Sequence, residues 1–175
     1  APPPAPSRHQ PPPGLAASLS RPYLEHPGNY LAFFSSFDYL RQASERLAQR
    51  HPQVPQFAQT RGMAEAGRLD FIARFTPDSQ GIGFAVLGGA FGEGIDLPGA
   101  RLIGAFIATL GLPQVNPVNE AMRDRLQVLL GDGWRHTYLR VIRTPEDQGL
   151  IVLLDERYAQ PEVRALLPAW WPAPT

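Results

Sequence analysis

Short apolar runs alternate along this chain with segments in which apolar residues recur at helical spacing. The apolar runs predict buried strands within residues 29–36, 83–89, 101–110 and 149–157. The amphipathic segments predict helices within residues 36–52, 63–75, 119–130 and 161–168. Apolar strands separated by helices are typical of a mostly parallel sheet covered on both faces. The pattern therefore predicts an α/β fold.

Two of the predicted helices carry more specific signals. Ser36 is a suitable N-cap for the first helix, and Pro52 follows its last turn. In the second helix the spacing of Leu69, Ile72 and Phe75 predicts an apolar stripe that faces the core.

The first residues differ from the rest. Residues 1–14 are rich in proline and have no apolar periodicity, which favours an extended conformation. We interpret residues 1–27 as a Pro-rich linker or irregular segment and residues 28–175 as one domain. A proline-rich ligand for another protein is the alternative use of this segment.

The composition excludes several kinds of chemistry. All 16 basic residues are arginine, so the chain has no phosphate-loop lysine and no catalytic lysine. It has no cysteine, so it holds no disulfide and no iron–sulfur cluster of its own. No apolar run reaches the ~20 residues that span a bilayer, and no secretory signal is seen. We therefore expect a cytoplasmic protein, in a bacterial-type cytosol or nucleoid, with no membrane partner.

A glycine-rich stretch, GGAFGEGIDLPG, follows the second predicted strand. Gly89 and Gly94 have the spacing of a phosphate-binding loop, but Ile95 and Asp96 stand where that loop needs Lys and Ser or Thr. Ligands of parallel sheets bind beyond the carboxyl ends of the strands, so this stretch is a candidate site. A tight strand connection with a solvated Glu93 is the alternative.

Two arginines near the last predicted strand form a second candidate. Arg140 and Arg143 are three residues apart, so in a helix they share a face and can reach one anion. A planar guanidinium is well suited to a transferring phosphoryl group. The alternative is a solvated helix face.

A family resemblance connects these segments. FGEGIDLPG, RVIRTPEDQGLIVLLDERY and the terminal LLPAWW resemble the second RecA-like motor domain of the XPD/DinG family of superfamily-two DNA helicases. GNYLAFFSSFDYL resembles motif IV of that family, and the similarity covers about residues 28–171. The resemblance implies a RecA-like three-layer sandwich and a role in ATP-dependent DNA unwinding.

The resemblance also implies roles for individual residues. ATP and Mg²⁺ would lie between two lobes and be bound mainly by a first motor domain absent from this chain. Arg143 would be the arginine finger and Arg140 a second γ-phosphate contact. Glu93, Gly94 and Asp96 would belong to motif V, which couples the nucleotide state to DNA grip.

The expected partners are single-stranded DNA and the first RecA-like motor domain. Ser35, Ser36, Gly88 and Gly89 would contact the DNA backbone, a contact that positions DNA without reading its sequence. An iron–sulfur cluster is possible only in the absent domain. The isolated chain, without a phosphate-loop lysine, would hydrolyse no ATP.

One departure from the family pattern leaves a second interpretation open. The family motif VI reads Gln-x-x-Gly-Arg-x-x-Arg, but His136 and Leu139 occupy the Gln and Gly positions before Arg140. The alternative function is a non-catalytic α/β interaction module derived from a helicase domain, with a degenerate motif VI.

Overall fold

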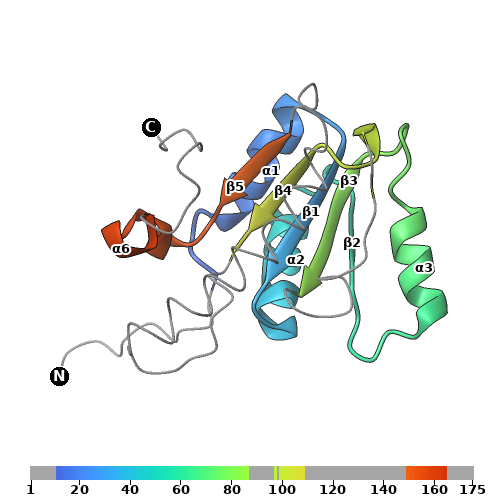
Figure 1. Cartoon of the computed structure of the whole chain (residues 1–175), viewed down its shortest axis with the longest axis horizontal. Helices are drawn as coiled ribbons and strands as arrows, with labels where there is room; N and C mark the ends of the chain where they lie inside the picture. The colour runs from blue at the N-terminus through green and yellow to red at the C-terminus, as the bar shows by residue number, and fades with distance from the viewer. Residues whose placement is uncertain (1–10, 87–96, 98, 109–148, 165–175) are drawn as a thin grey trace.

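The computed structural model of the chain describes residues 11–86, 97, 99–108 and 149–164. In this part, five strands form one parallel sheet in the order β2-β3-β1-β4-β5 (Figure 1). The strands are β1 (Asn29–Phe34), β2 (Gln56–Ala58), β3 (Gly81–Val86), β4 (Gly104–Ile107) and β5 (Leu150–Leu153). The parallel sheet and the RecA-like α/β class predicted from the sequence are confirmed.

The helices follow the strands in the alternation expected of this class. They are α1 (Leu15–Glu25), α2 (Phe37–Arg50), α3 (Glu65–Ala73) and α6 (Pro161–Arg164). The described residues also include two short 3-10 helices. The first, η1 (Gly99–Arg101), precedes β4, and the second, η3 (Glu156–Ala159), follows β5.

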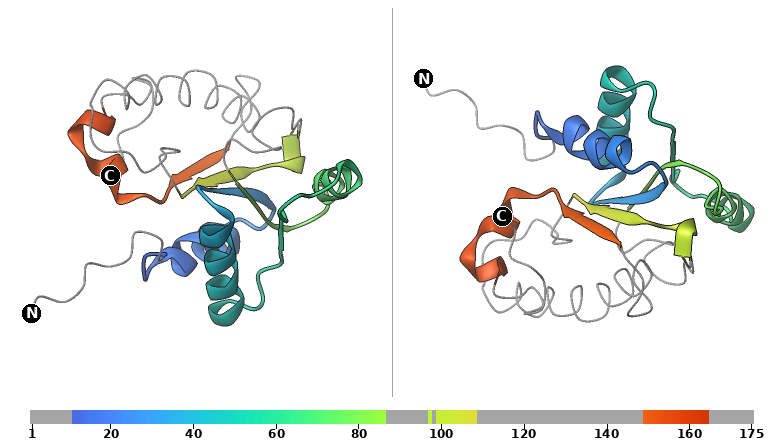
Figure 2. Two further views of the ribbon diagram at one scale, coloured as in Figure 1. Left: turned by 90° about the horizontal axis from the view of Figure 1, so that it is seen from below. Right: turned by 90° about the horizontal axis from the view of Figure 1, so that it is seen from above.

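The sheet separates two apolar clusters because alternate side chains of a strand point to opposite faces. Tyr30, Ala32 and Phe34 of β1 join a cluster with residues of α1 and α2. Leu31 and Phe33 join the other cluster, which includes Phe71 and Phe75 from α3 and the turn after it. Figure 2 shows α1 and α2 together on one side of the sheet. All six residues of β1 are buried, which explains why its sequence is apolar after Asn29.

The interpretation of residues 1–27 as an irregular segment is wrong over residues 15–25, which form α1. Leu15, Leu19 and Tyr23 recur every four residues and fill the cluster shared with α2. This burial offsets the backbone hydrogen bond that Pro22 cannot make inside the helix. The chain before α1 is also held, because the Arg46 guanidinium donates a hydrogen bond of 2.6 Å to the carbonyl of Pro11.

The apolar stripe predicted for α3 is partly wrong. Leu69 is 59% exposed, whereas Phe71 and Phe75 are buried. The Phe57 ring of β2 packs edge-on against both phenylalanines, with centroid distances of 4.9 Å and 5.2 Å. The strand β2, which the sequence analysis did not predict, therefore decides which face of α3 is covered.

Candidate functional site at the carboxyl edge of the sheet

Because every strand pair is parallel, all five strands end at one edge, here called the carboxyl edge. Phe34 at the end of β1 pairs with Val86 at the end of β3. Ile107 at the end of β4 pairs with Leu153 at the end of β5. The chain therefore leaves the central strand β1, at Ser35, directly beside the point where it leaves β3. This is the edge at which parallel sheets bind ligands.

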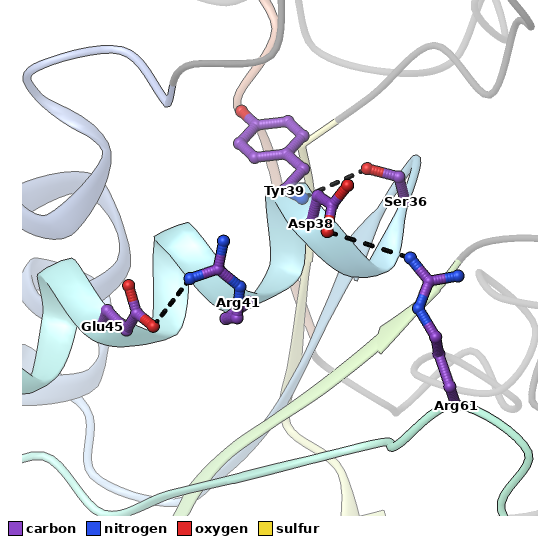
Figure 3. A network of polar contacts seen from close by, with 6 residues as sticks. All are labelled: Ser36, Asp38, Tyr39, Arg41, Glu45 and Arg61. Atoms are coloured by element: carbon purple, nitrogen blue, oxygen red, sulfur yellow. Dashed lines mark hydrogen bonds and ion pairs between the residues drawn. The ribbon is translucent and has the colours of Figure 1, made fainter.

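Ser35 and Ser36, two of the predicted DNA contacts, lie at this edge between β1 and α2. The Ser36 hydroxyl oxygen accepts a hydrogen bond of 3.1 Å from the backbone N–H of Tyr39, so Ser36 is the N-cap of α2 as predicted (Figure 3). Ser35 is exposed to solvent. Contact of either residue with DNA stays a prediction.

A buried glutamine at the same edge was missed by the sequence analysis. Gln59 follows β2 and is only 7% exposed. Its backbone N–H donates to the Phe84 carbonyl at 2.8 Å, and its side-chain oxygen accepts from the Val86 N–H at 2.9 Å. Gln59 thus extends the pairing between β2 and β3 beyond the end of β2 and fixes the last residue of β3. No sequence signal marked Gln59, because β2 is only three residues long.

Directly after Gln59 the chain makes a tight turn that carries Arg61. The Met63 N–H donates to the Thr60 carbonyl at 3.3 Å, and Gly62 has a φ of 61°, a conformation that glycine adopts without strain. The Arg61 guanidinium lies 5.0 Å from the centroid of the Phe37 ring. One of its terminal nitrogens is 3.8 Å from a carboxylate oxygen of Asp38, as Figure 3 shows. Arg61 therefore lies over the first turn of α2.

An acid–arginine pair follows β5, the strand at the opposite end of the sheet from β2. The Asp155 carboxylate accepts hydrogen bonds from the backbone N–H and the Nε of Arg157, at 3.0 Å and 2.7 Å, and also pairs with the Nη2 of that guanidinium. Burial, reinforced by the charge of Asp155, raises the pKa of Tyr39 to about 12. The same two causes raise the pKa of Tyr158. Both phenols are therefore neutral at physiological pH.

The remaining predicted site residues lie outside the described part of the chain. They are Gly88, Gly89, Glu93, Gly94 and Asp96 of the glycine-rich stretch, and Arg140 and Arg143. Within residues 11–86, 97, 99–108 and 149–164, no group of three or more His, Cys, Asp or Glu side chains could hold a metal ion. No helix in these ranges is long and apolar enough to cross a membrane.

Comparison with known proteins gives the family. Residues 20–174 match the family described as Helicase C-terminal domain. The chain is 27% identical over 190 residues to a regulator of telomere elongation helicase 1 homolog of Culex quinquefasciatus, an alignment that covers 90% of this chain and 19% of the relative. It is 27% identical over 161 residues to a probable ATP-dependent helicase of Methanocaldococcus jannaschii, covering 75% of this chain and 24% of that protein. The chain thus spans about a fifth to a quarter of the length of these relatives.

Solved structures agree on the fold. A structure of XPD without ligand superposes with a TM-score of 0.61 at 16% identity, covering 87% of this chain and 33% of that one. Domain 2 of the DEAD-box helicase Mss116p, bound to an RNA duplex, gives a TM-score of 0.57 at 16% identity, covering 87% of this chain and 55% of the other. The family match extends over nearly the whole chain, and the fold is that of a RecA-like helicase domain. The chain therefore belongs to the helicase C-terminal domain family, as a C-terminal domain of the XPD/DinG type of superfamily two.

Proposed function

We propose that this domain is the second motor lobe of an ATP-dependent DNA helicase and completes an ATP cleft that begins on a first motor domain. The observation that carries the proposal is the family match over residues 20–174. The relatives are themselves named as helicases, which supports ATP-dependent strand separation in the full-length protein. The pairing of Phe34 with Val86 also supports it, because Ser35 and the glycine-rich stretch then start from adjacent strand ends.

Phosphoryl transfer from ATP depends mainly on positioning and on stabilisation of negative charge. In the proposed mechanism Arg143 donates hydrogen bonds to the γ-phosphate as charge develops on it, and Arg140 makes a second contact to the same group. A guanidinium suits this role because it stays protonated and presents paired donors to phosphate oxygens. ATP and Mg²⁺ are bound mainly by the first motor domain, since this chain has no lysine for a phosphate loop.

In the proposed mechanism, the loops that follow the strands couple the nucleotide state to DNA binding. Glu93, Gly94 and Asp96 act as motif V between the nucleotide and the DNA. Ser35, Ser36, Gly88 and Gly89 contact the backbone of single-stranded DNA through hydroxyl and N–H groups. Such contacts let the lobe hold DNA of any sequence, as a translocating motor requires.

Substitution of the proposed finger tests the catalytic role. In the full-length protein we expect Arg143→Ala to lower the rate of DNA-stimulated ATP hydrolysis by about 10³- to 10⁵-fold, the range observed for arginine fingers. DNA binding without nucleotide should stay near the wild-type level. Arg41→Ala is the matched control, because Arg41 is an exposed arginine on α2 whose partner is Glu45. An Arg143→Ala variant that hydrolyses ATP at the wild-type rate would refute the role.

The rate of ATP hydrolysis also distinguishes the motor function from the alternative function. His136 and Leu139 at the motif VI positions favour a non-catalytic interaction module derived from a helicase domain. Such a module predicts that the full-length wild-type protein hydrolyses no ATP, with or without DNA, and that nucleotide does not alter its DNA affinity. DNA-stimulated hydrolysis by the wild-type protein would exclude it.

A further inference from the structure

The turn that carries Arg61 is anchored where it begins and is closed by a hydrogen bond of its own. Before it, the backbone and side chain of Gln59 bond to Phe84 and Val86 at the end of β3. Within it, the Thr60–Met63 hydrogen bond and the positive φ of Gly62 set the reversal of the chain. Arg61 is therefore presented from a defined turn and not from a long loop, which lowers the backbone entropy lost when a ligand binds there.

The Arg61 guanidinium contacts two neighbouring side chains, but its hydrogen-bond donors are not used by them. The guanidinium carbon lies 5.0 Å from the centroid of the Phe37 ring, a cation–π contact that favours this position of the group. Its separation of 3.8 Å from the Asp38 carboxylate is longer than a hydrogen bond, and Arg61 donates no hydrogen bond within the described residues. The Arg61 side chain is 71% exposed. Its N–H donors therefore face solvent and are available to a ligand.

Three other arginines of the described part, Arg41, Arg101 and Arg157, are engaged differently. Arg41 donates to Glu45 at 3.0 Å, and Arg101 donates to the Phe75 carbonyl at 2.7 Å. Arg157 is bonded to Asp155 by its backbone and side chain. These three groups already satisfy part of their donor capacity within the domain.

Arg61 also changes the charge beside the first turn of α2. Asp38, in the first turn of α2, is 71% exposed and repels a phosphate placed near Ser35. The Arg61 guanidinium lies beside this carboxylate, as Figure 3 shows. Its positive charge offsets the negative charge of Asp38. Ser36, which follows Ser35 in the chain, and Arg61 both lie at the first turn of α2 in Figure 3. A guanidinium binds phosphate oxygens in paired hydrogen bonds.

We infer that Arg61 contacts a backbone phosphate of the single-stranded DNA that crosses the carboxyl edge beside Ser35, and that Gln59 is the positioning residue of the turn that presents it. This inference rests on the proposed function and adds a contact to it. Neither residue belongs to the motifs that identified the family in the sequence.

The salt dependence of DNA binding tests the contact. Each phosphate neutralised on a single strand contributes a slope of about −0.7 to the dependence of log affinity on log salt. Fluorescence anisotropy with an oligothymidylate should therefore show that Arg61→Gln in the full-length protein reduces the magnitude of the slope by about 0.7. At 0.1 M salt, this change in slope corresponds to about fivefold weaker binding of DNA by Arg61→Gln than by the wild type. Arg61→Lys should keep the slope, because it retains the charge.

Arg41→Gln is the control, since it removes an arginine of similar exposure, 61%, that also faces an acidic partner. It should leave the slope unchanged. Wild-type binding with an Arg61→Gln slope equal to that of the wild type overturns this inference and leaves the proposed function intact. A full-length wild-type protein that binds no single-stranded DNA overturns both.

Discussion

Gln59 offers the sharpest test of how the carboxyl edge is built. Its side-chain oxygen accepts the N–H of Val86 at 2.9 Å, and the residue is only 7% exposed. The substitution Gln59→Leu keeps a side chain of similar size but removes the acceptor. The Val86 N–H, which lies partly buried at the end of β3, then loses its partner.

The cost follows from the asymmetry of buried hydrogen bonds. A made hydrogen bond contributes only about 1 kcal/mol net, but a buried donor left unsatisfied costs ~1–3 kcal/mol. We therefore expect Gln59→Leu to lower the free energy of unfolding by about 1–3 kcal/mol. With a urea m-value of roughly 2 kcal/mol per molar, the denaturation midpoint falls by about 0.5–1.5 M.

Equilibrium urea denaturation of the domain, followed by far-UV circular dichroism, measures this change. Gln53→Leu is the matched control, because Gln53 is an exposed glutamine in the connection between α2 and β2. A surface substitution of this kind changes stability by no more than about 0.5 kcal/mol. If Gln59→Leu and Gln53→Leu have the same midpoint, Gln59 does not hold the end of β3, and its positioning role fails with it.

Two further predictions concern the first turn of α2. Ser36→Ala removes the cap on the Tyr39 N–H and should lower the free energy of unfolding by about 0.5–2 kcal/mol in thermal denaturation. Ser35→Ala should leave the stability nearly unchanged. Equal effects of the two substitutions would contradict the capping role. The pKa of Tyr39 is about 12 in the folded state, against 10.0 for an unperturbed tyrosine. The unfolded chain therefore releases this proton first as the pH rises. The contribution of neutral Tyr39 to stability is complete below pH 10 and is lost between about pH 10 and 12. Urea midpoints measured across this range should fall less steeply in Tyr39→Phe than in the wild type, and identical profiles would refute the assignment.

The elements that the sequence predicted correctly are those with strong local signals. β1 and β3 appear as unbroken apolar runs because they are interior strands with nearly all residues buried. The α2 helix has Ser36 at its start and a regular stripe of Leu40, Ala43 and Leu47, all three of them buried. In each case the residues that make the signal also make the contact.

The errors arose where long-range packing overrides the local pattern. The α1 helix was missed because it follows a proline-rich segment and contains Pro22, yet its burial against α2 and β1 stabilises it. Leu69 was assigned to the core and is exposed, because Phe57 of β2 packs against the face of α3 that carries Phe71. A three-residue strand such as β2 is too short for any periodic signal.

By itself, the sequence determined the α/β class, the parallel character of the sheet and the absence of any lysine for a phosphate loop. It also carried the motifs of the family, because these properties reside in residue types and short spacings. Only the tertiary structure decided the strand order, the burial of Gln59 against Val86 and the placement of Arg61 over the first turn of α2. These contacts join residues more than twenty positions apart, and their geometry depends on how strands pair and helices pack.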